Sequence, residues 1–183
     1  APLVRTGGSR HTGLAALPYR NIQYSIITLM AIAMLFPITA FAQAYVQTWD
    51  LVDSGKHLDY DGNSTYMSYI NTGAATWNAY KSGVIRKDSA FVVEDVYVSD
   101  VNASNGWAGM TYSSGKIELN TYYMSGYSNS KKQNVATHEL GHALGLDHST
   151  STDVMDAAIT GHTSTQALSQ NDKDSYDAAY NNY

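Results

Sequence analysis

Three histidines and a glutamate stand close together between residues 138 and 148, where the chain follows the pattern H-E-x-x-H-x-x-G-x-x-H. Residues four apart on an α-helix share one face and lie about 6 Å apart along its axis, so His138 and His142 can bind one cation. Gly145 can adopt the left-handed conformation that ends a helix, which lets the chain turn back and bring His148 to the same ion. The spacing therefore predicts a metal site with three histidine ligands.

The ligand set and the glutamate indicate the chemistry of this site. Three neutral imidazoles suit zinc and leave the fourth tetrahedral position open, which distinguishes a catalytic zinc site from a structural one. Glu139 directly follows the first histidine, where its carboxylate is better placed to meet a metal-bound water than to bind the metal. The whole pattern arises by accident in on the order of one chain in ten thousand of this length. We therefore predict a zinc-dependent peptidase site, with zinc as cofactor and Glu139 as the catalytic residue.

Hydrophobic periodicity predicts an α+β domain over residues 43–183 that positions this site. Tyr45 to Val52 alternates as a first strand, and residues 59–63 have the composition of a turn. Apolar residues at helical intervals predict a helix between Tyr66 and Tyr80. The β-branched residues of Phe91 to Val98 predict a second strand.

The second half of the domain contains a predicted hairpin and the helix that carries the histidines. Trp107 to Tyr112 and Lys116 to Tyr123 flank a Ser-Ser-Gly turn, which is typical of two antiparallel strands. Ser130 and Gln133 have the spacing of a capping box and predict the start of the helix that carries the histidines. Ser169 and Asp172 have the same spacing and predict a last helix that runs through Tyr180.

Residues 1–42 differ in composition from the rest of the chain. They contain no acidic residue, and residues 22–42 form a mainly apolar run that closes with Ala40-Phe41-Ala42. This A-x-A-like cleavage signal favours a signal peptide and a secreted protein that begins at Gln43. The run is also long enough to span a bilayer, so an uncleaved membrane anchor is the alternative. Residues 1–21 show no periodicity and are left as an unassigned N-terminal extension.

The charge of the remaining domain limits its partners. All sixteen acidic residues follow residue 42, together with eight of the eleven Lys and Arg, so residues 43–183 carry a formal charge of 8 − 16 = −8. An acidic surface without basic clusters argues against nucleic acid and anionic lipid. The absence of cysteine excludes disulfides, so packing and bound metal must stabilise the domain. We expect a monomer that acts on a protein or peptide and has no stable membrane association after signal cleavage.

The histidine motif, followed seven residues later by Met155, resembles the metzincin metallopeptidases, in which a methionine-containing turn lies beneath the zinc site. Ser149-Thr150 and Leu168-Ser169-Gln170-Asn171-Asp172 resemble the matrixins, particularly the short bacterial ones. The resemblance implies the metzincin fold, with a mixed twisted sheet, an active-site helix and a C-terminal helix. It also implies that substrate lies against Trp107 to Tyr112, an edge strand, and that residues 156–167 shape the pocket for the side chain after the cut.

Other metal sites of the resembled family are not expected in their usual form. Vertebrate matrixins bind a second, structural zinc through histidines upstream of the catalytic helix, and residues 58–137 contain no histidine. We therefore expect one catalytic zinc. Asp95, Asp100 and Glu118 are carboxylates that calcium could use, but acidic surface residues are far more often simply solvated, so calcium is not assigned to any of them.

Two functions of different classes follow from these residues. The first is a secreted zinc metalloendopeptidase that hydrolyses peptide bonds of proteins through a zinc-activated water. The alternative is a catalytically silent zinc-binding module for adhesion or recognition. Glu139 argues against the alternative, because binding alone needs no general base.

Overall fold

The computed structural model describes residues 43–89 and 93–183, so the predicted segments 1–21 and 22–42 lie outside the described residues. Five strands form one sheet in the order β2-β1-β3-β5-β4. Every neighbouring pair is parallel except β4 with β5, and β4 ends the sheet, so the expected mixed sheet and edge strand are both present. The strands are β1 (Leu58–Gly62), β2 (Ile85–Lys87), β3 (Val96–Val101), β4 (Gly109–Tyr112) and β5 (Lys116–Asn120).

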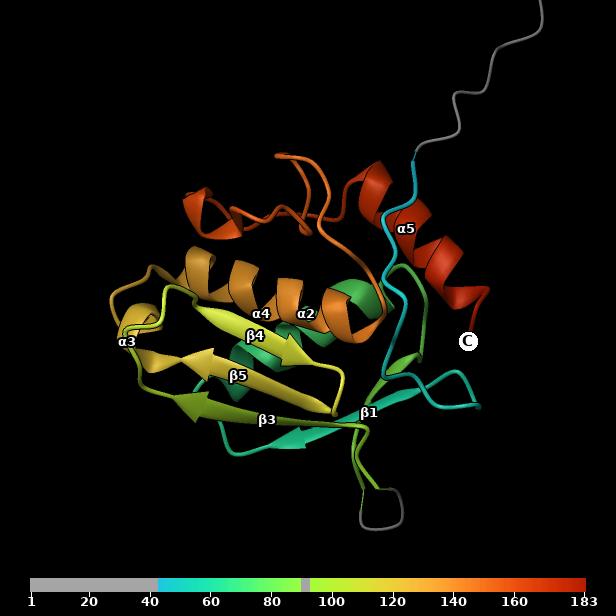
Figure 1. Cartoon of the computed structure of the whole chain (residues 1–183), viewed down its shortest axis with the longest axis horizontal. Helices are drawn as coiled ribbons and strands as arrows, with labels where there is room; N and C mark the ends of the chain where they lie inside the picture. Colours follow the sequence, from blue (N-terminus) through green and yellow to red (C-terminus); the bar gives the residue numbers. More distant parts are fainter. Residues whose placement is uncertain (1–42, 90–92) are drawn as a thin grey trace, which may run out of the picture. The chain divides into compact units, whose positions relative to one another are not determined.

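The described residues also form four α-helices and one 3₁₀ turn. These are α2 (Met67–Asn78), α3 (Thr121–Met124), α4 (Asn129–Ala143), η1 (Ile159–Gly161) and α5 (Gln170–Tyr180). Figure 1 shows α4 running alongside β4, with α2 behind α4 and α5 near the C-terminus. The predicted capping box is present at the start of α5, where Ser169 and Asp172 bond reciprocally. The α+β class, the active-site helix and the C-terminal helix are thus confirmed.

Trp77 of α2 joins three helices at the centre of the core. Its side chain is fully buried, and its indole Nε1 donates to the carbonyl oxygen of Thr137 in α4 at 2.9 Å. The ring of Tyr176 in α5 meets the indole edge to face, with centroids 5.5 Å apart. Gly73 brings α2 close to α4, since a Cβ there would lie 3.1 Å from the Cα of Thr137. This packing holds the middle of α4 in one position.

The hairpin forms as predicted, although its second arm ends earlier. Gly115 closes the turn with a φ of +85°, a conformation that favours glycine. Ile117 and Leu119 of β5 are fully buried, as their alternation requires. Residue 121, expected to continue this arm, instead begins α3. The second strand was predicted over residues 91–98, and β3 overlaps only its last residues because β3 begins at Val96.

Residues 45–52 do not form the first strand that their alternation predicts. They run beside the end of α4, where Val46 makes an isolated bridge with Leu146 and Leu51 N donates to the carbonyl oxygen of Ala143 at 2.9 Å. The alternating residues therefore face the end of a helix and not a sheet. The prediction of a strand here was wrong because periodicity reports burial on one side without identifying the neighbour.

The first strand, β1, lies where the sequence predicts a turn. Asp59 is buried within it, and Arg86 of β2 donates to both of its carboxylate oxygens, through Nε at 2.8 Å and Nη2 at 2.5 Å. A buried carboxylate is tolerated when a bidentate guanidinium satisfies it. The turn composition was misleading because this partner lies 27 residues away in the chain.

Helix α4 begins two residues before the start that a capping serine at residue 130 predicts. Its N-cap is Ser128, whose hydroxyl accepts from Lys131 N at 3.3 Å. Gln133 does not reach back to cap the helix, because its side-chain amide is buried and donates to the carbonyl oxygen of Tyr69 in α2 at 3.0 Å. The predicted capping box over residues 130–133 is therefore wrong, whereas the helix itself is present.

Within residues 43–89 and 93–183, no helix combines the length and the apolar character that a membrane span requires. The apolar run over residues 22–42 is not part of this finding.

Candidate metal centre

The three histidines of the motif lie together at the C-terminal end of α4. His138 and His142 are one turn apart on the helix, which ends at Ala143. Gly145 then has a φ of +84°, the left-handed conformation predicted for it, and the chain turns back to His148. The Nε2 atom of His148 lies 3.3 Å from Nε2 of His138 and 3.2 Å from Nε2 of His142. Local backbone geometry thus brings the three rings together.

This arrangement fits a tetrahedral zinc ion. Zn–N bonds of about 2.0–2.1 Å at tetrahedral angles separate two ligand nitrogens by about 3.3 Å, close to both observed distances. The Nδ1 atoms of His138 and His142 donate to the carbonyl oxygens of Val154 and Leu146, at 2.8 and 2.9 Å. Their Nε2 atoms are therefore unprotonated, and the lone pairs converge on one point. The three rings therefore form a group that could hold one metal ion.

Burial keeps the two helix histidines in the form that binds metals. It lowers the pKa of His138 to about 3 and that of His142 to about 4, because a charged imidazolium is disfavoured away from water. Both rings are neutral at physiological pH. The side-chain amide of Gln47 also lies against the ring of His142, with its nitrogen 2.8 Å from Nδ1.

Glu139 lies beside the histidines and is almost fully buried. Burial raises the pKa of its carboxyl group to about 7, although a hydrogen bond from the Thr111 hydroxyl opposes this shift. Gly109 of β4 lets the carboxyl group approach the strand closely, because a Cβ at this position would lie 2.5 Å from Glu139 Oε1. The carboxyl group is therefore held between α4 and the edge strand, with a pKa suited to exchanging protons near neutrality.

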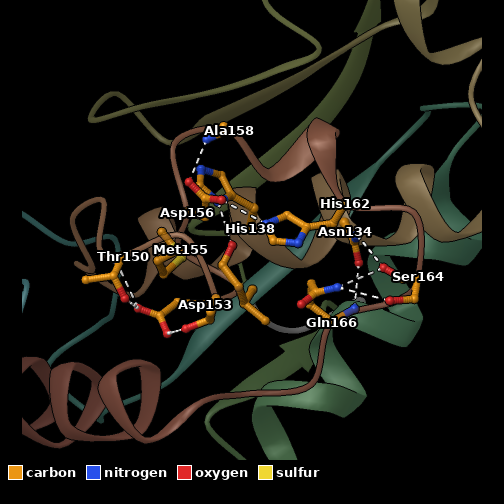
Figure 2. A network of polar contacts seen from close by, with 12 residues as sticks. Asn134, His138, Thr150, Asp153, Met155, Asp156, Ala158, His162, Ser164 and Gln166 are labelled. Atoms are coloured by element: carbon orange, nitrogen blue, oxygen red, sulfur yellow. Dashed lines mark hydrogen bonds and ion pairs between the residues drawn. The ribbon is translucent and has the colours of Figure 1, made fainter.

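The turn that contains Met155 is fixed by two buried carboxylates. Asp172 of α5 accepts from the backbone N–H groups of Val154 at 2.9 Å and of Met155 at 3.1 Å. Asp153 accepts from the Thr150 hydroxyl at 2.8 Å, and both residues are labelled in Figure 2. Since Val154 also accepts from His138, these contacts fix the orientation of the first histidine.

A cavity of about 240 Å³ opens beside the histidines. Its walls combine His138 and Glu139 with strand β4 and with Val135, Ala157 and Ile159. The loop over residues 156–167 therefore lines the cavity, as the resemblance implies. A larger open hollow of about 440 Å³ lies elsewhere, beside Tyr80 and Lys173, and has no metal-binding side chain in its wall.

Figure 2 shows two sets of contacts that hold the loop beside this cavity. Asn134, buried on α4, donates to the carbonyl oxygen of Ser164 and accepts from Gln166 N, both at 2.9 Å. Within the loop, His162 Nε2 lies 2.8 Å from Asp156 Oδ2. The loop is thus bonded both to the histidine helix and to itself.

The carboxylates considered for calcium are already engaged by protein donors. Asp100 accepts from the hydroxyls of Ser64 and Thr65, and Glu118 accepts from Lys116. Asp95 accepts from Asp59 N at 2.8 Å. Asp95 also belongs to a group of three close carboxylates, the others being Asp53 and Asp59. Arg86 already donates to both carboxylate oxygens of Asp59 in this group, so calcium stays unassigned.

Three residues of the site had no signal in the sequence. Gln47, Gly109 and Thr111 contact the motif residues from segments that lie 28 to 95 residues away. Nothing in their local patterns indicates these contacts, because each depends on how β4 and residues 45–52 pack against α4.

The fold and this site are those of a class of zinc metallopeptidases. In this class two histidine ligands lie on one helix, and the third follows the turn that ends the helix. The family model for matrixins matches residues 39–181, which is 143 of 183 residues, and the chain belongs to the matrixin family.

One solved structure similar to the chain is High choriolytic enzyme 1, a hatching enzyme zinc-protease from the medaka Oryzias latipes. The identity is 19% and the TM-score is 0.31, with 62% of this chain and 54% of that chain covered. This chain thus spans little more than half the length of that protein. No curated protein matches the chain.

The free energy of unfolding of the metal-free protein should show how much the burial of Glu139 destabilises the fold. Because its pKa is raised from the ordinary 4.5 to about 7, the folded state keeps a proton that the unfolded state loses, and stability falls as pH rises from 4.5 through 7. Glu139→Gln removes the ionisable group, so we expect it to stabilise metal-free protein at pH 8 by on the order of 3 kcal/mol and to have little effect at pH 4. Urea unfolding after chelation checks this, and an equal gain at both pH values would contradict it.

Proposed function

We propose that this chain is a secreted zinc metalloendopeptidase that cleaves internal peptide bonds of protein substrates. His138, His142 and His148 would bind zinc, and Glu139 would act as general base. The observation that carries the proposal is the convergence of three histidine Nε2 atoms beside a buried carboxyl group and an open cavity. Bound zinc would supply Lewis acidity, polarising the peptide carbonyl and lowering the pKa of a water.

The chain's own residues supply the remaining chemistry. Glu139 takes the proton of the attacking water and delivers it to the leaving amine, for which a pKa near neutrality is suited. Strand β4 ends the sheet, so its outer edge is suited to pair with an extended peptide backbone. The turn at Met155 keeps His138 oriented through the carbonyl oxygen of Val154.

The cavity beside β4 favours an aliphatic substrate side chain after the cut. Val135 and Ile159 supply apolar wall, and no lysine or arginine lines the cavity. An aspartate there would lose hydration without gaining an opposite charge, and a lysine would find only Glu139, the group proposed as the general base. We expect peptides with leucine at this position to have a higher kcat/KM than peptides with lysine or aspartate, as measured with a set of peptides that differ only there.

Zinc removal tests the function directly. The protein is assayed on denatured casein before chelation, after chelation and after addition of one equivalent of zinc, and its metal content is measured. We expect activity to be lost and then restored at one zinc per chain. His148→Ala should prevent restoration, whereas the control His57→Ala, changed in a turn outside the site, should not. Chelator-insensitive hydrolysis would reject the proposal, and stoichiometric zinc without any hydrolysis would favour the silent binding module.

Secretion is a separate part of the proposal and needs its own test. It rests on the apolar run and Ala40-Phe41-Ala42, which lie outside the described residues. Mass spectrometry of protein released by the producing cells should find Gln43 as the first residue. Protein that stays in the membrane fraction with residues 22–42 attached would establish the anchor instead.

The bonds from Asn134 to the loop should control substrate preference. We expect Asn134→Ala to loosen residues 156–167 and to reduce the preference for leucine about 5- to 10-fold in relative kcat/KM, because the cavity wall is no longer bonded to α4. Gln166→Ala is the matched control, since its backbone N–H still reaches Asn134. An unchanged preference in Asn134→Ala would show that the loop keeps its position without these bonds.

A further inference from the structure

Thr111 of β4 directs its hydroxyl at Glu139. Its Oγ1 lies 2.7 Å from Oε2 of the glutamate side chain and 2.9 Å from the glutamate's own backbone carbonyl oxygen. Both contacts cross from the edge strand to α4, between residues 28 apart in the chain. One hydroxyl therefore touches both the side chain and the backbone of the proposed general base.

Glu139 has few other polar contacts. Among the residues that the structure describes, Thr111 is the one side chain whose hydrogen bond with the glutamate carboxyl is found. On the other side, Gly109 leaves no room between β4 and Oε1. The backbone of Gly109 thus confines the carboxyl group on one side, and the hydroxyl of Thr111 orients it.

A hydroxyl suits this task because it can donate one hydrogen bond and accept others. When Glu139 is ionised, Thr111 donates to Oε2. When Glu139 carries a proton on Oε2, the acid can donate to Oγ1, and Thr111 can turn its own proton to the backbone carbonyl oxygen of Glu139. Both bonds fit the observed distances, so the carboxyl group keeps one orientation in either form. A lysine ammonium or a backbone N–H can only donate, so neither could accept the hydrogen bond of a proton on Oε2.

We propose that Thr111 is a positioning residue, whose hydroxyl holds the Glu139 carboxyl group in the orientation needed for proton transfer throughout the reaction. This inference rests on the proposed peptidase function. It also links substrate binding to the base, since Thr111 belongs to the strand that is proposed to pair with substrate.

Three variants test the proposal. Thr111→Val keeps the shape of the side chain and removes the hydroxyl, and we expect kcat to fall about 10- to 100-fold while KM changes less than about 3-fold. Thr111→Ser keeps the hydroxyl and should retain kcat within about 5-fold. Thr72→Val is the matched control, because it removes a hydroxyl that bonds a backbone carbonyl on the exposed side of α2, at 3.0 Å. All three should bind one zinc per chain.

A crystal structure of each variant, with and without zinc, gives a readout independent of activity. In Thr111→Val we expect the Glu139 carboxyl group to rotate or to occupy more than one orientation, and in Thr111→Ser to keep that of the wild type. If Thr111→Val fails to fold, Thr111→Ala takes its place with the same expectations.

Wild-type kcat in the variant without the hydroxyl would overturn the proposal, as would an unmoved Glu139 or a serine variant as impaired as the valine variant. A wild-type protein without zinc-dependent hydrolysis would instead overturn the peptidase function. In that case the crystal structures would still decide whether Thr111 orients Glu139.

Discussion

Glu139→Gln is expected to lower kcat for peptide hydrolysis by about 1000-fold while leaving one zinc bound per chain. Glutamine keeps the size of the side chain and can still contact Thr111, but its amide cannot take a proton from water at neutral pH. The three imidazoles are unchanged, so metal binding should persist. Turnover of a quenched fluorescent peptide, together with metal analysis of the same samples, measures both properties.

Glu94→Gln is the control for this prediction, because it makes the same change of charge at an exposed position. It should retain wild-type activity. A Glu139→Gln protein that keeps more than a tenth of the wild-type kcat with zinc bound would show that another group acts as the base.

Gly141→Ala is expected to have the largest effect on stability, about 3 kcal/mol or more. A Cβ at Gly141 would lie 2.3 Å from Met155 Sδ and 2.9 Å from Trp77 Cζ2. Both side chains are at most 1% exposed, so neither has free space into which it can move. The methionine turn would have to shift away from α4, and zinc affinity should fall together with stability. Urea unfolding and zinc titration check the two effects.

Gly161→Ala provides the comparison, because a Cβ there meets nothing within 4 Å. Its stability should stay within about 1 kcal/mol of the wild type. If Gly141→Ala is equally mild, the contact between α4 and the methionine turn is not close in the folded protein.

Much of the fold could be predicted where the signal is local. Hydrophobic spacing predicts α2 and the hairpin, and the capping box of Ser169 and Asp172 is formed as expected. These features depend on residues within a few positions of one another, whose geometry the backbone determines. The strand β1 was missed because the ion pair between Asp59 and Arg86 that permits it is not local.

The same distinction divides the candidate site. The sequence by itself determined the three histidines and Glu139, since a helical turn followed by a glycine with positive φ is enough to bring the rings together. Only the tertiary structure decided what surrounds them. Thr111, Gly109 and Asp172 reach the motif or its methionine turn from other strands and helices. Burial among such neighbours shifts the pKa values of His138, His142 and Glu139. Desolvation and hydrogen bonding depend on neighbours in space, which residue spacing along the chain does not specify.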